Sequence, residues 1–276
     1  MGLLLGGVFA LSWASILIRL CEAPPLVIAL YRMGLATLLL APGFAWARGR
    51  RGLALAWSFG PGLLLAGLFL GLHFALWVSS LFHTSVASSV FFVTTHPLWV
   101  AFAARWLFGE KVGRPLIFAV GLTTVGGAVT AWGDWGESGS RLYGNGLALG
   151  GALMMAGYLL VGRRLRPKVA LFPYGFFAYG GAALVLFLLT AWQGLSLAPY
   201  PGQTFLFLFL LALGPTLLGH SALNWALRHL ASPAVALAVV GEPVLASLLA
   251  WGVLGEGLTP ARALGGGLMA AGVALG

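Results

Sequence analysis

Two stretches of this sequence carry nearly the same pattern: TTHPLWVAFAARWLFGE at residues 94–110 and VGEPVLASLLAWGVLGE at residues 240–256. In both, a polar or small residue pair leads into a proline, and twelve residues separate that proline from the glutamate of a closing Gly-Glu. From position 96 to position 242 the offset is 146, a little over half of the 276-residue chain. The spacing predicts two copies of one unit, and duplicated halves in a membrane protein are typical of transporters.

The composition is that of a membrane protein. Apolar residues make up 60% of the chain and charged residues only 8%, whereas a soluble domain carries about 25% charged residues. Nearly uncharged segments of about 20 residues recur, which is the length of a helix that crosses a bilayer core. The alternating segments of about ten residues expected of a β-barrel are absent. We therefore predict an all-α, polytopic membrane protein, because helices satisfy their own backbone in lipid.

Ten transmembrane helices are predicted from apolar segments separated by short polar or proline-containing breaks. They cover residues 2–19, 25–47, 54–80, 86–107, 115–133, 143–162, 171–193, 203–228, 233–254 and 260–275. The longest polar stretch, residues 134–141, divides the chain into a first repeat, 1–138, and a second repeat, 139–276. Each half holds an odd number of spans, so the second copy must cross the membrane in the opposite direction. The expected fold is two inverted five-helix repeats that form one membrane unit.

Basic residues set the expected orientation. With the N-terminus in the cytoplasm, the inner loops and their flanks hold eleven Lys and Arg residues and the outer ones hold three. This bias predicts cytoplasmic N- and C-termini, in an inner (plasma) membrane of the bacterial type. The net charge of +9 then belongs to loops beside lipid headgroups. Because the chain has no basic domain, we expect the lipid bilayer as a partner and no nucleic acid.

Residues outside the two quoted stretches also occur in matched pairs, in the same order in both halves. The pairs, at offsets of 145 to 148, are Trp13 with Tyr158, Arg19 with Arg164, Tyr31 with Tyr179, His73 with His220, and Gly127 with Gly272. Small drifts in offset are what loop insertions would produce. The matches extend the predicted repeat over most of the chain.

Several of these features resemble a known family. They are the Leu30-Tyr31-Arg32 stretch, the internal proline of each fourth span, and the Gly-Glu pairs at 109–110 and 255–256. On these features the chain resembles, over essentially its whole length, the EamA-type branch of the drug/metabolite transporter superfamily. The aromatic-rich spans and the histidines at 73 and 96 most resemble the YddG-type amino-acid exporters. The resemblance implies ten helices, cytoplasmic termini, a central cavity, and export of amino acids or similar small metabolites.

Glu242 is the acidic residue near the centre of a predicted span, where a carboxylate costs a few kcal/mol unless it is protonated, paired or facing water. Its mate is His96. Each directly precedes a proline, Pro97 or Pro243, which removes a backbone donor and can kink the helix. We predict that His96 and Glu242 line a substrate cavity, and that protons are a candidate coupling ion. The alternative is structural, with a protonated, hydrogen-bonded Glu242 and a His96 that bridges helices.

Aromatic and polar residues of other spans complete the predicted substrate site. His73 and Trp77 are four residues apart and share one helix face, as do His96 and Trp99, which are three apart. Ordinary helix packing is the alternative for the aromatic residues, and interhelical hydrogen bonding is the alternative for Asn224. The remaining predicted substrate-binding residues are Tyr31, Tyr179, Trp13, Tyr158 and Asn224.

The roles of charged residues at other positions are open to more than one interpretation. Arg32 lies about a turn and a half into the second span, where it could snorkel outward or face the cavity and attract a carboxylate. Glu110 and Glu256 lie at span ends, and we expect each to pair with a nearby basic group.

The sequence lacks the motifs of the main catalytic classes. No phosphate-binding Gly-x-x-x-x-Gly-Lys loop, metal-ligand spacing or nucleophile elbow occurs, so we expect no direct use of ATP, no cofactor, no metal and no enzymatic activity. We expect an exporter of amino acids, aromatic and apolar ones included, or of related small metabolites, that works by alternating access about a midplane cavity. A multidrug or cation exporter of the same superfamily is the alternative, since Glu242 and the aromatic residues suit a cation. An alternative of another class, a membrane scaffold or intramembrane enzyme, predicts no flux.

Overall fold

The computed structural model describes residues 2–46, 49–109, 113–132, 139–232, 235, 238–257 and 259–275, and all regular structure within them is helical. The first helices are α1 (Gly2–Ser12), α2 (Ala14–Arg19), α3 (Pro25–Trp46), α4 (Gly49–Ser80), α5 (Val86–Val93), α6 (His96–Phe108) and α7 (Arg114–Trp132). Those that follow are α8 (Gly139–Leu165), α9 (Leu171–Trp192), α10 (Gly202–Leu211), η1 (Ala212–His220), α11 (Ser221–Ala226), η2 (Val239–Gly241), α13 (Glu242–Leu254) and α14 (Pro260–Leu275).

The helices lie where the apolar segments predicted them. Six helical stretches in the described part of the chain are long and apolar enough to cross a membrane: Pro25–Ala45, Ser58–Ser80, Val86–Phe108, Arg141–Leu165, Leu171–Trp192 and Gly202–Ala226. Shorter apolar helices occupy Leu4–Arg19, Ile117–Val129 and Glu242–Leu254. The protein is therefore a polytopic helical membrane protein.

One long stretch departs from α-helical geometry for a reason that lies in its sequence. Pro215 has no backbone N–H, so it cannot donate to the carbonyl oxygen of Leu211 as an α-helix requires. The hydroxyl of Thr216 donates to that oxygen instead, at 3.0 Å. The backbone widens into the π-helix η1 around this position, and the chain continues as α11 without a loop.

The helices α6 and α13 are built alike. Each follows an interruption, with a turn at Thr94 and Thr95 before α6 and the short 3-10 helix η2 before α13. Each carries a proline in its first turn, where the missing N–H costs no intrahelical bond. Each ends at a glycine in the left-handed region, Gly109 with φ 65° and Gly255 with φ 71°. Glycine is favoured there because it has no Cβ to clash.

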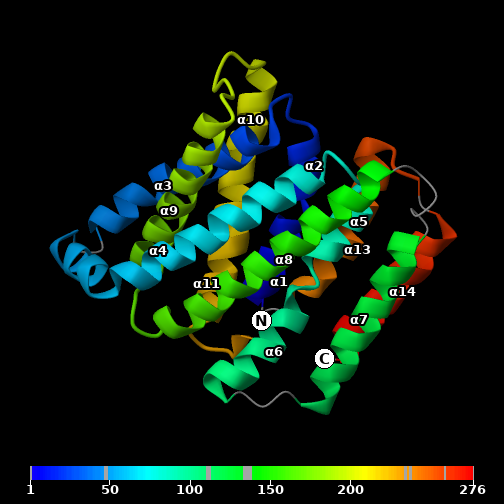
Figure 1. The fold of residues 1–276 in the computed structure, drawn as a ribbon. Helices are drawn as coiled ribbons and strands as arrows, with labels where there is room; N and C mark the ends of the chain where they lie inside the picture. The colour runs from blue at the N-terminus through cyan, green and yellow to red at the C-terminus, as the bar shows by residue number, and fades with distance from the viewer. Residues whose placement is uncertain are drawn as a thin grey trace.

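Glycines also set how closely two other helices approach. Figure 1 shows α7 and α14 side by side at the right of the molecule, and these two helices pack on one another along their length. A Cβ added to Gly126 would lie 2.6 Å from the carbonyl oxygen of Gly265, and one added to Gly272 would lie 2.8 Å from that of Ala119. Small residues at such interfaces let helix backbones meet in lipid.

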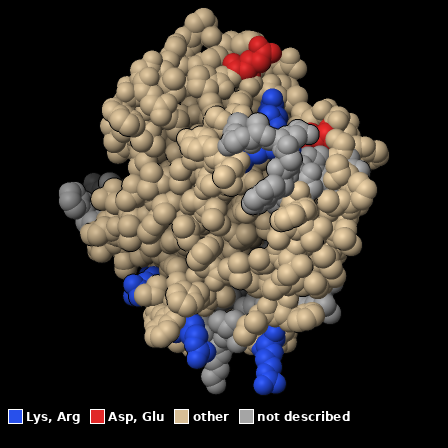
Figure 2. Space-filling model, turned by 45° about the vertical axis from the view of Figure 1, so that its right-hand side comes forward, with Lys and Arg blue, Asp and Glu red and all other residues tan. Residues whose placement is uncertain are grey.

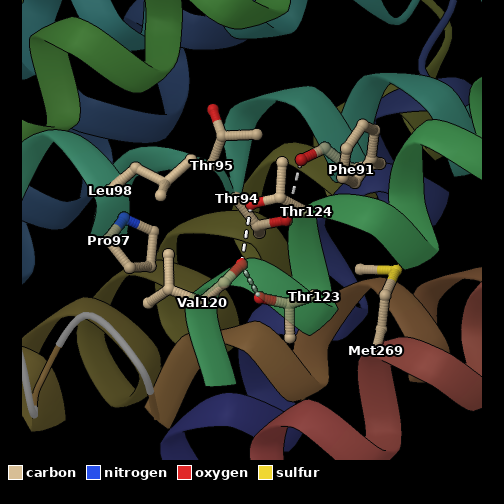
Figure 3. A pocket seen from close by; sticks show the side chains of 9 residues that line it. All are labelled: Phe91, Thr94, Thr95, Pro97, Leu98, Val120, Thr123, Thr124 and Met269. Atoms are coloured by element: carbon tan, nitrogen blue, oxygen red, sulfur yellow. Dashed lines mark hydrogen bonds between the residues drawn. The ribbon is translucent and has the colours of Figure 1, made fainter. Parts of the chain in front are cut away.

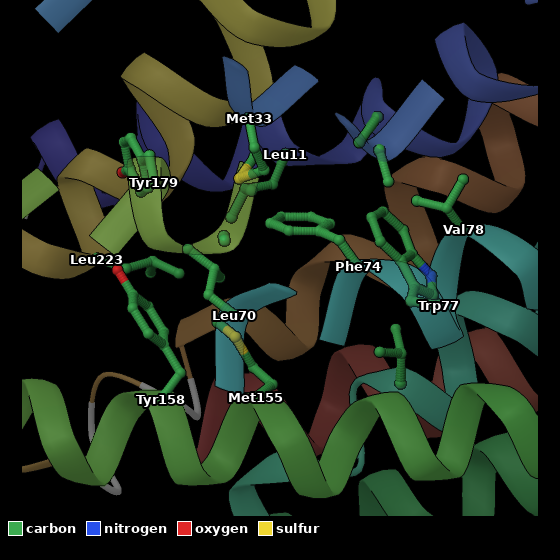
Figure 4. Packing of buried hydrophobic residues seen from close by; sticks show 14 of the residues in the cluster. Leu11, Met33, Leu70, Phe74, Trp77, Val78, Met155, Tyr158, Tyr179 and Leu223 are labelled. Carbon is green, nitrogen blue, oxygen red and sulfur yellow. The ribbon is translucent and has the colours of Figure 1, made fainter. Parts of the chain in front are cut away.

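The remaining helices pack in crossed pairs around a buried centre. α4 packs against α8 and α9, and α3 packs against α9. α1 packs against η1 and α13, and α6 packs against α8. Figure 4 shows the buried aromatic and sulfur-containing side chains at this centre, among them Phe74, Trp77 and Met155, which approach from α4 and α8.

The surface of the helical bundle matches a lipid environment. Large apolar side chains point outward on many helices, including Phe102, which is 69% exposed, and Trp192, which is 82% exposed. On the face shown in Figure 2, Lys and Arg side chains cluster at the lower end, Asp and Glu side chains lie near the upper end beside basic ones, and the broad band between them is uncharged. An uncharged band between two charged ends is the pattern expected of a membrane-spanning protein.

Candidate functional site

A cavity of about 30 Å³ lies where the two interrupted helices meet. This volume holds about two water molecules. Its lining side chains come from helices far apart in the sequence, and they are Leu11, His73, Trp77, Val93, Thr94, His96, Met155, His220, Leu223, Val239 and Glu242. The cavity combines an apolar wall with three imidazoles, an indole and one carboxyl group.

His96 and Glu242 face this cavity from the first residues of α6 and α13, and both side chains are buried. The Nδ1 atom of His96 lies 3.1 Å from the carbonyl oxygen of Val93. Because a carbonyl can only accept, Nδ1 carries the proton, and the neutral ring leaves Nε2 as an acceptor. That Nε2 is buried without a hydrogen-bond partner. The site therefore offers an unused acceptor next to an ionisable carboxyl group.

His73 and Trp77 form a stacked pair on α4 at the opposite wall of the cavity. Their ring centroids are 5.9 Å apart with an angle of 16° between the planes, as expected of residues one turn apart. The Nδ1 of His73 donates to the carbonyl oxygen of Gly151 at 2.9 Å, which ties α4 to α8. The Nε1–H of Trp77 is buried and has no acceptor, so this wall presents an unused donor.

Two residues that the site prediction left out lie in or beside the cavity. His220 lines it, and its Nδ1 is buried without a partner. Its predicted match with His73 between the two halves of the sequence was the available signal. Arg32 lies on α3 and is completely buried. The structure therefore excludes the outward-pointing orientation, which was one of the two interpretations that the sequence allowed. The Nε of Arg32 donates to the Thr216 hydroxyl at 2.7 Å, and its Cζ lies 4.3 Å from the centroid of the Phe74 ring.

Tyr158, Tyr179 and Asn224 form a hydrogen-bonded cluster beside the cavity. All three are fully buried and none lines the cavity. The Tyr158 hydroxyl donates to Oδ1 of Asn224 at 2.7 Å, and Nδ2 of Asn224 donates to the Tyr179 hydroxyl at 3.2 Å. Figure 4 shows Tyr158 on α8 and Tyr179 on α9, with Leu223 beside both. This cluster satisfies its own polar atoms, which is what a buried structural network requires.

The other three predicted residues lie away from the cavity. Tyr31 donates to the carbonyl oxygen of Leu197 in the loop between α9 and α10, at 3.0 Å. Trp13 is half-buried at the junction of α1 and α2 and packs against the apolar core. Trp99 is 38% exposed. Of the ten predicted substrate-binding residues, the structure brings His73, Trp77, His96 and Glu242 together around one cavity.

A second, smaller pocket of about 10 Å³ lies behind the interruption that precedes α6. Figure 3 shows Thr94, at the end of α5, and Thr123 and Thr124, in the middle of α7, around this pocket. Their hydroxyls donate to backbone carbonyls three or four residues earlier, at 2.7 to 3.0 Å. Thr94 also lines the first cavity, so the turn separates the two spaces.

One end of the bundle is tied together by Glu256, just beyond α13. Its Oε1 lies 3.5 Å from an Arg19 guanidinium nitrogen and accepts from the backbone N–H of Val86 at 3.3 Å. The same nitrogen of Arg19 donates to the carbonyl oxygen of Thr84 at 3.2 Å. The expected basic partner of Glu256 is thus Arg19, and we name this contact the Arg19–Glu256 latch. Glu110, for which a similar pairing is predicted, lies outside the described residues.

No group of three or more His, Cys, Asp or Glu side chains suited to a metal ion occurs in the part of the chain that the structure describes. Besides the three histidines, the lining of the cavity contains a single carboxyl group, that of Glu242. His73 and His96 each use one ring nitrogen in a hydrogen bond to a backbone carbonyl oxygen.

Comparisons with known proteins agree with this architecture. A solved crystal structure, described only as that of a protein, superposes with a TM-score of 0.77, covers 99% of this chain and 94% of the other, and is 20% identical. At that identity the likeness shows the fold alone. No curated protein matches the chain. The EamA-like transporter family model matches residues 1–132 and 142–275. The chain therefore belongs to the EamA-like transporter family, whose members carry out transport and are not enzymes.

Proposed function

We propose that this transporter exports amino acids, aromatic and apolar ones included, or closely related small metabolites, in the manner of the YddG-type exporters that its sequence resembles. The observation that carries the proposal is the cavity at which His96 and Glu242 meet opposite His73 and Trp77. A carboxyl group and an unused imidazole acceptor suit an ammonium group, and the aromatic wall suits an apolar side chain.

The packing of the helices supports two inverted repeats, residues 1–138 and 139–276, with ten membrane crossings. In the predicted repeat, α1 corresponds to α8, α4 to η1, and α6 to α13. The contact between α4 and α8 therefore corresponds to the contact between η1 and α1. The contact between α6 and α8 corresponds in the same way to the contact between α13 and α1. All four pairs pack. The pairs α3 with α9 and α7 with α14 map onto themselves, and they pack as well. A pseudo-two-fold axis has this consequence, and the twofold match of one family model agrees with it.

The proposed orientation has both termini in the cytoplasm of a bacterial-type inner membrane. Basic residues near the ends of α6, α8 and α11 share one end of the bundle, since Arg164 lies 5.1 Å above the Phe108 ring and Arg166 interacts with Arg228. The Arg19–Glu256 latch lies at the opposite end, and that end becomes the outer one.

Alternating access follows from the size of the cavity. A space of about 30 Å³ accepts about two waters and no amino acid, so the helices around it must move to admit substrate. The interruptions before α6 and α13 are the natural hinges, because a turn precedes one helix and a short 3-10 segment precedes the other, so regular α-helical geometry is already broken there. The Arg19–Glu256 latch joins the first and last parts of the chain and closes the outer side while substrate enters from within.

A cation exporter of the same superfamily is the second candidate. It is favoured by Glu242, the single acidic residue of the cavity, which faces aromatic rings. A scaffold or an intramembrane enzyme, the candidates of another class, predict no flux of any solute.

The test is transport by the purified protein in liposomes, with a panel of amino acids and organic cations, with and without a pH gradient. We expect flux of apolar or aromatic amino acids, reduced in Glu242→Gln and unchanged in the matched control Glu22→Gln, whose carboxyl group is exposed at the outer end of the bundle. Flux of cations alone would replace the main proposal by the second candidate. Absence of all flux would refute both. Stimulation by the pH gradient that Glu242→Gln abolishes would assign proton coupling to Glu242.

A further inference from the structure

The whole side chain of Arg32 is buried inside this membrane protein. Its exposure is zero, although it lies only seven residues after the start of α3 at Pro25. A charged group buried at membrane depth is costly, and it is retained where it pairs or serves a pathway. The question is therefore what the guanidinium group of Arg32 binds.

The contacts of Arg32 use only part of its donor capacity. Nε donates to Thr216 at 2.7 Å, and the face of the guanidinium lies on Phe74, with Trp77 at 5.8 Å. The terminal nitrogens Nη1 and Nη2 are buried without a hydrogen-bond partner. These two nitrogens form the fork that binds a carboxylate through two parallel hydrogen bonds. Thr216 and Phe74 hold the fork in place and leave it empty.

The acidic group that interacts with Arg32 is not bonded to it. Glu242 interacts electrostatically with Arg32, but within the described residues the two make no ion pair within 4.0 Å. The two groups therefore interact without bonding to each other, and the helices around the cavity must move before a ligand can contact both. Trp77 belongs to both environments, since its ring lines the cavity and lies next to the guanidinium group.

We infer that Arg32 binds the carboxylate of a zwitterionic amino-acid substrate while Glu242 binds its ammonium group. This inference rests on the proposed function and names the chemistry of its site. One cation and one carboxylate give a site with no net charge, which fits a zwitterion. A phosphate ester would bring two negative charges to a single arginine beside a carboxylate, and an organic cation would leave Arg32 without a partner. When the cavity enlarges to admit substrate, movement of Trp77 opens the way to Nη1 and Nη2.

The test compares two substrates that differ only in the carboxylate. Phenylalanine and phenethylamine have the same ring and the same ammonium group. In liposomes containing the wild-type protein we expect phenylalanine to be transported and phenethylamine to compete with it poorly. In Arg32→Gln, phenylalanine transport falls roughly 10- to 150-fold, the range for loss of hydrogen bonds to a charged partner. The preference for phenylalanine over phenethylamine falls to about one.

Three further variants keep the test interpretable if Arg32→Gln does not fold. Arg32→Lys keeps the charge and loses the fork, so the preference drops only in part. Thr216→Val removes the hydroxyl that orients Nε and weakens phenylalanine transport without removing the charge. Arg228→Gln, at an exposed arginine, is the matched control and leaves the preference unchanged.

The outcomes separate this inference from the proposed function. Equal competition by phenethylamine and by phenylalanine methyl ester against phenylalanine in the wild-type protein overturns the role of a carboxylate contact and leaves amino-acid transport standing. An unchanged preference in folded Arg32→Gln overturns the role of Arg32 alone. If the wild-type protein carries neither compound nor any other amino acid, the proposed function fails and this inference fails with it.

Discussion

The interruptions that precede α6 and α13 share a backbone and differ in chemistry. Both lead into thirteen-residue helices with a proline in the first turn, and both helices end at a glycine whose N–H bonds to the fifth residue before it. One presents His96, a neutral acceptor when Nδ1 is bonded to Val93, and the other presents Glu242, an ionisable carboxyl group. The comparison teaches that two interruptions with similar backbones can present different chemistry, since the residue before the proline is an imidazole in one and a carboxyl group in the other.

The largest effect is expected from changing the chemistry of that pair. Glu242→Gln removes a charge-assisted contact with substrate, so transport falls roughly 10- to 150-fold. His96→Phe removes a neutral acceptor and costs less, about 2- to 10-fold. Initial rates in liposomes measure both. Equal effects of the two substitutions would contradict the comparison, because His96 and Glu242 would then contribute equally to transport.

The exchange variant sharpens the same point. His96→Glu combined with Glu242→His places the same two groups on opposite hinges. If the pseudo-symmetry holds, this double variant transports better than Glu242→Gln, since a carboxyl group again faces the cavity. Transport no better than that of Glu242→Gln would show that the carboxyl group is needed on α13 specifically.

The next largest effect is expected from substituting the matched glycines at the ends of α6 and α13. A Cβ on Gly255 would meet no atom within 4 Å, so Gly255→Ala costs only the left-handed conformation, about 1–2 kcal/mol. Gly109→Ala is expected to cost the same. Thermal unfolding in detergent measures this. Gly252→Ala, inside α13 and also facing open space, is the control and stabilises by about 0.5–1 kcal/mol. Loss of stability in only one of the two helices would contradict the structural equivalence.

The mates Trp13 and Tyr158 extend the comparison beyond the hinges. The Tyr158 hydroxyl is fully buried and donates to Asn224, so Tyr158→Phe should lower the free energy of unfolding by about 1 kcal/mol and leave transport nearly unchanged. Trp13→Phe, at a half-buried junction, should cost less. A large loss of transport in folded Tyr158→Phe would instead place the hydroxyl in contact with substrate.

The smallest expected effect concerns the Arg19–Glu256 latch, and the single cysteine reports on it. Cys21 lies between α2 and α3, and burial raises the pKa of its thiol to about 12. Little thiolate is present at pH 8, and labelling by a maleimide should be slow and should speed up as pH rises. The latch is partly exposed and is worth ~0.2–1 kcal/mol. Glu256→Gln should therefore accelerate labelling up to about fivefold, while Arg228→Gln at the other end should not.

Much of the fold follows from the sequence because segment length and polarity decide which stretches enter a membrane. Helix positions such as α3 and α9 agree within a residue or two with the predicted ranges 25–47 and 171–193. The π-helix η1 was not predicted, since it depends on whether Thr216 replaces the donor that Pro215 lacks. That choice is made by tertiary contacts, here the bond from Arg32 to the same threonine.

The site is predictable to a smaller extent. His73, Trp77, His96 and Glu242 were marked by polarity or aromaticity inside apolar spans, and the structure places them on one cavity. Trp99 is also aromatic and was predicted to share the face of His96, but its side chain is 38% exposed and does not line the cavity. Apolar lining residues such as Leu11 and Met155 carry no signal that separates them from core or lipid-facing positions. Their role depends on the packing of distant helices.

The separated charges of Arg32 and Glu242 have a consequence for the membrane potential. Both groups remain on the protein during transport, and a zwitterion adds no net charge to the site. Moving one elementary charge through the membrane changes the free energy by about 2.3 kcal/mol per 100 mV. A zwitterion carried alone has no net charge, so the membrane potential does not change the free energy of its transport. Export should then proceed at the same rate in polarised and depolarised vesicles. A proton carried by Glu242 in each cycle would make the current measurable and the rate dependent on voltage.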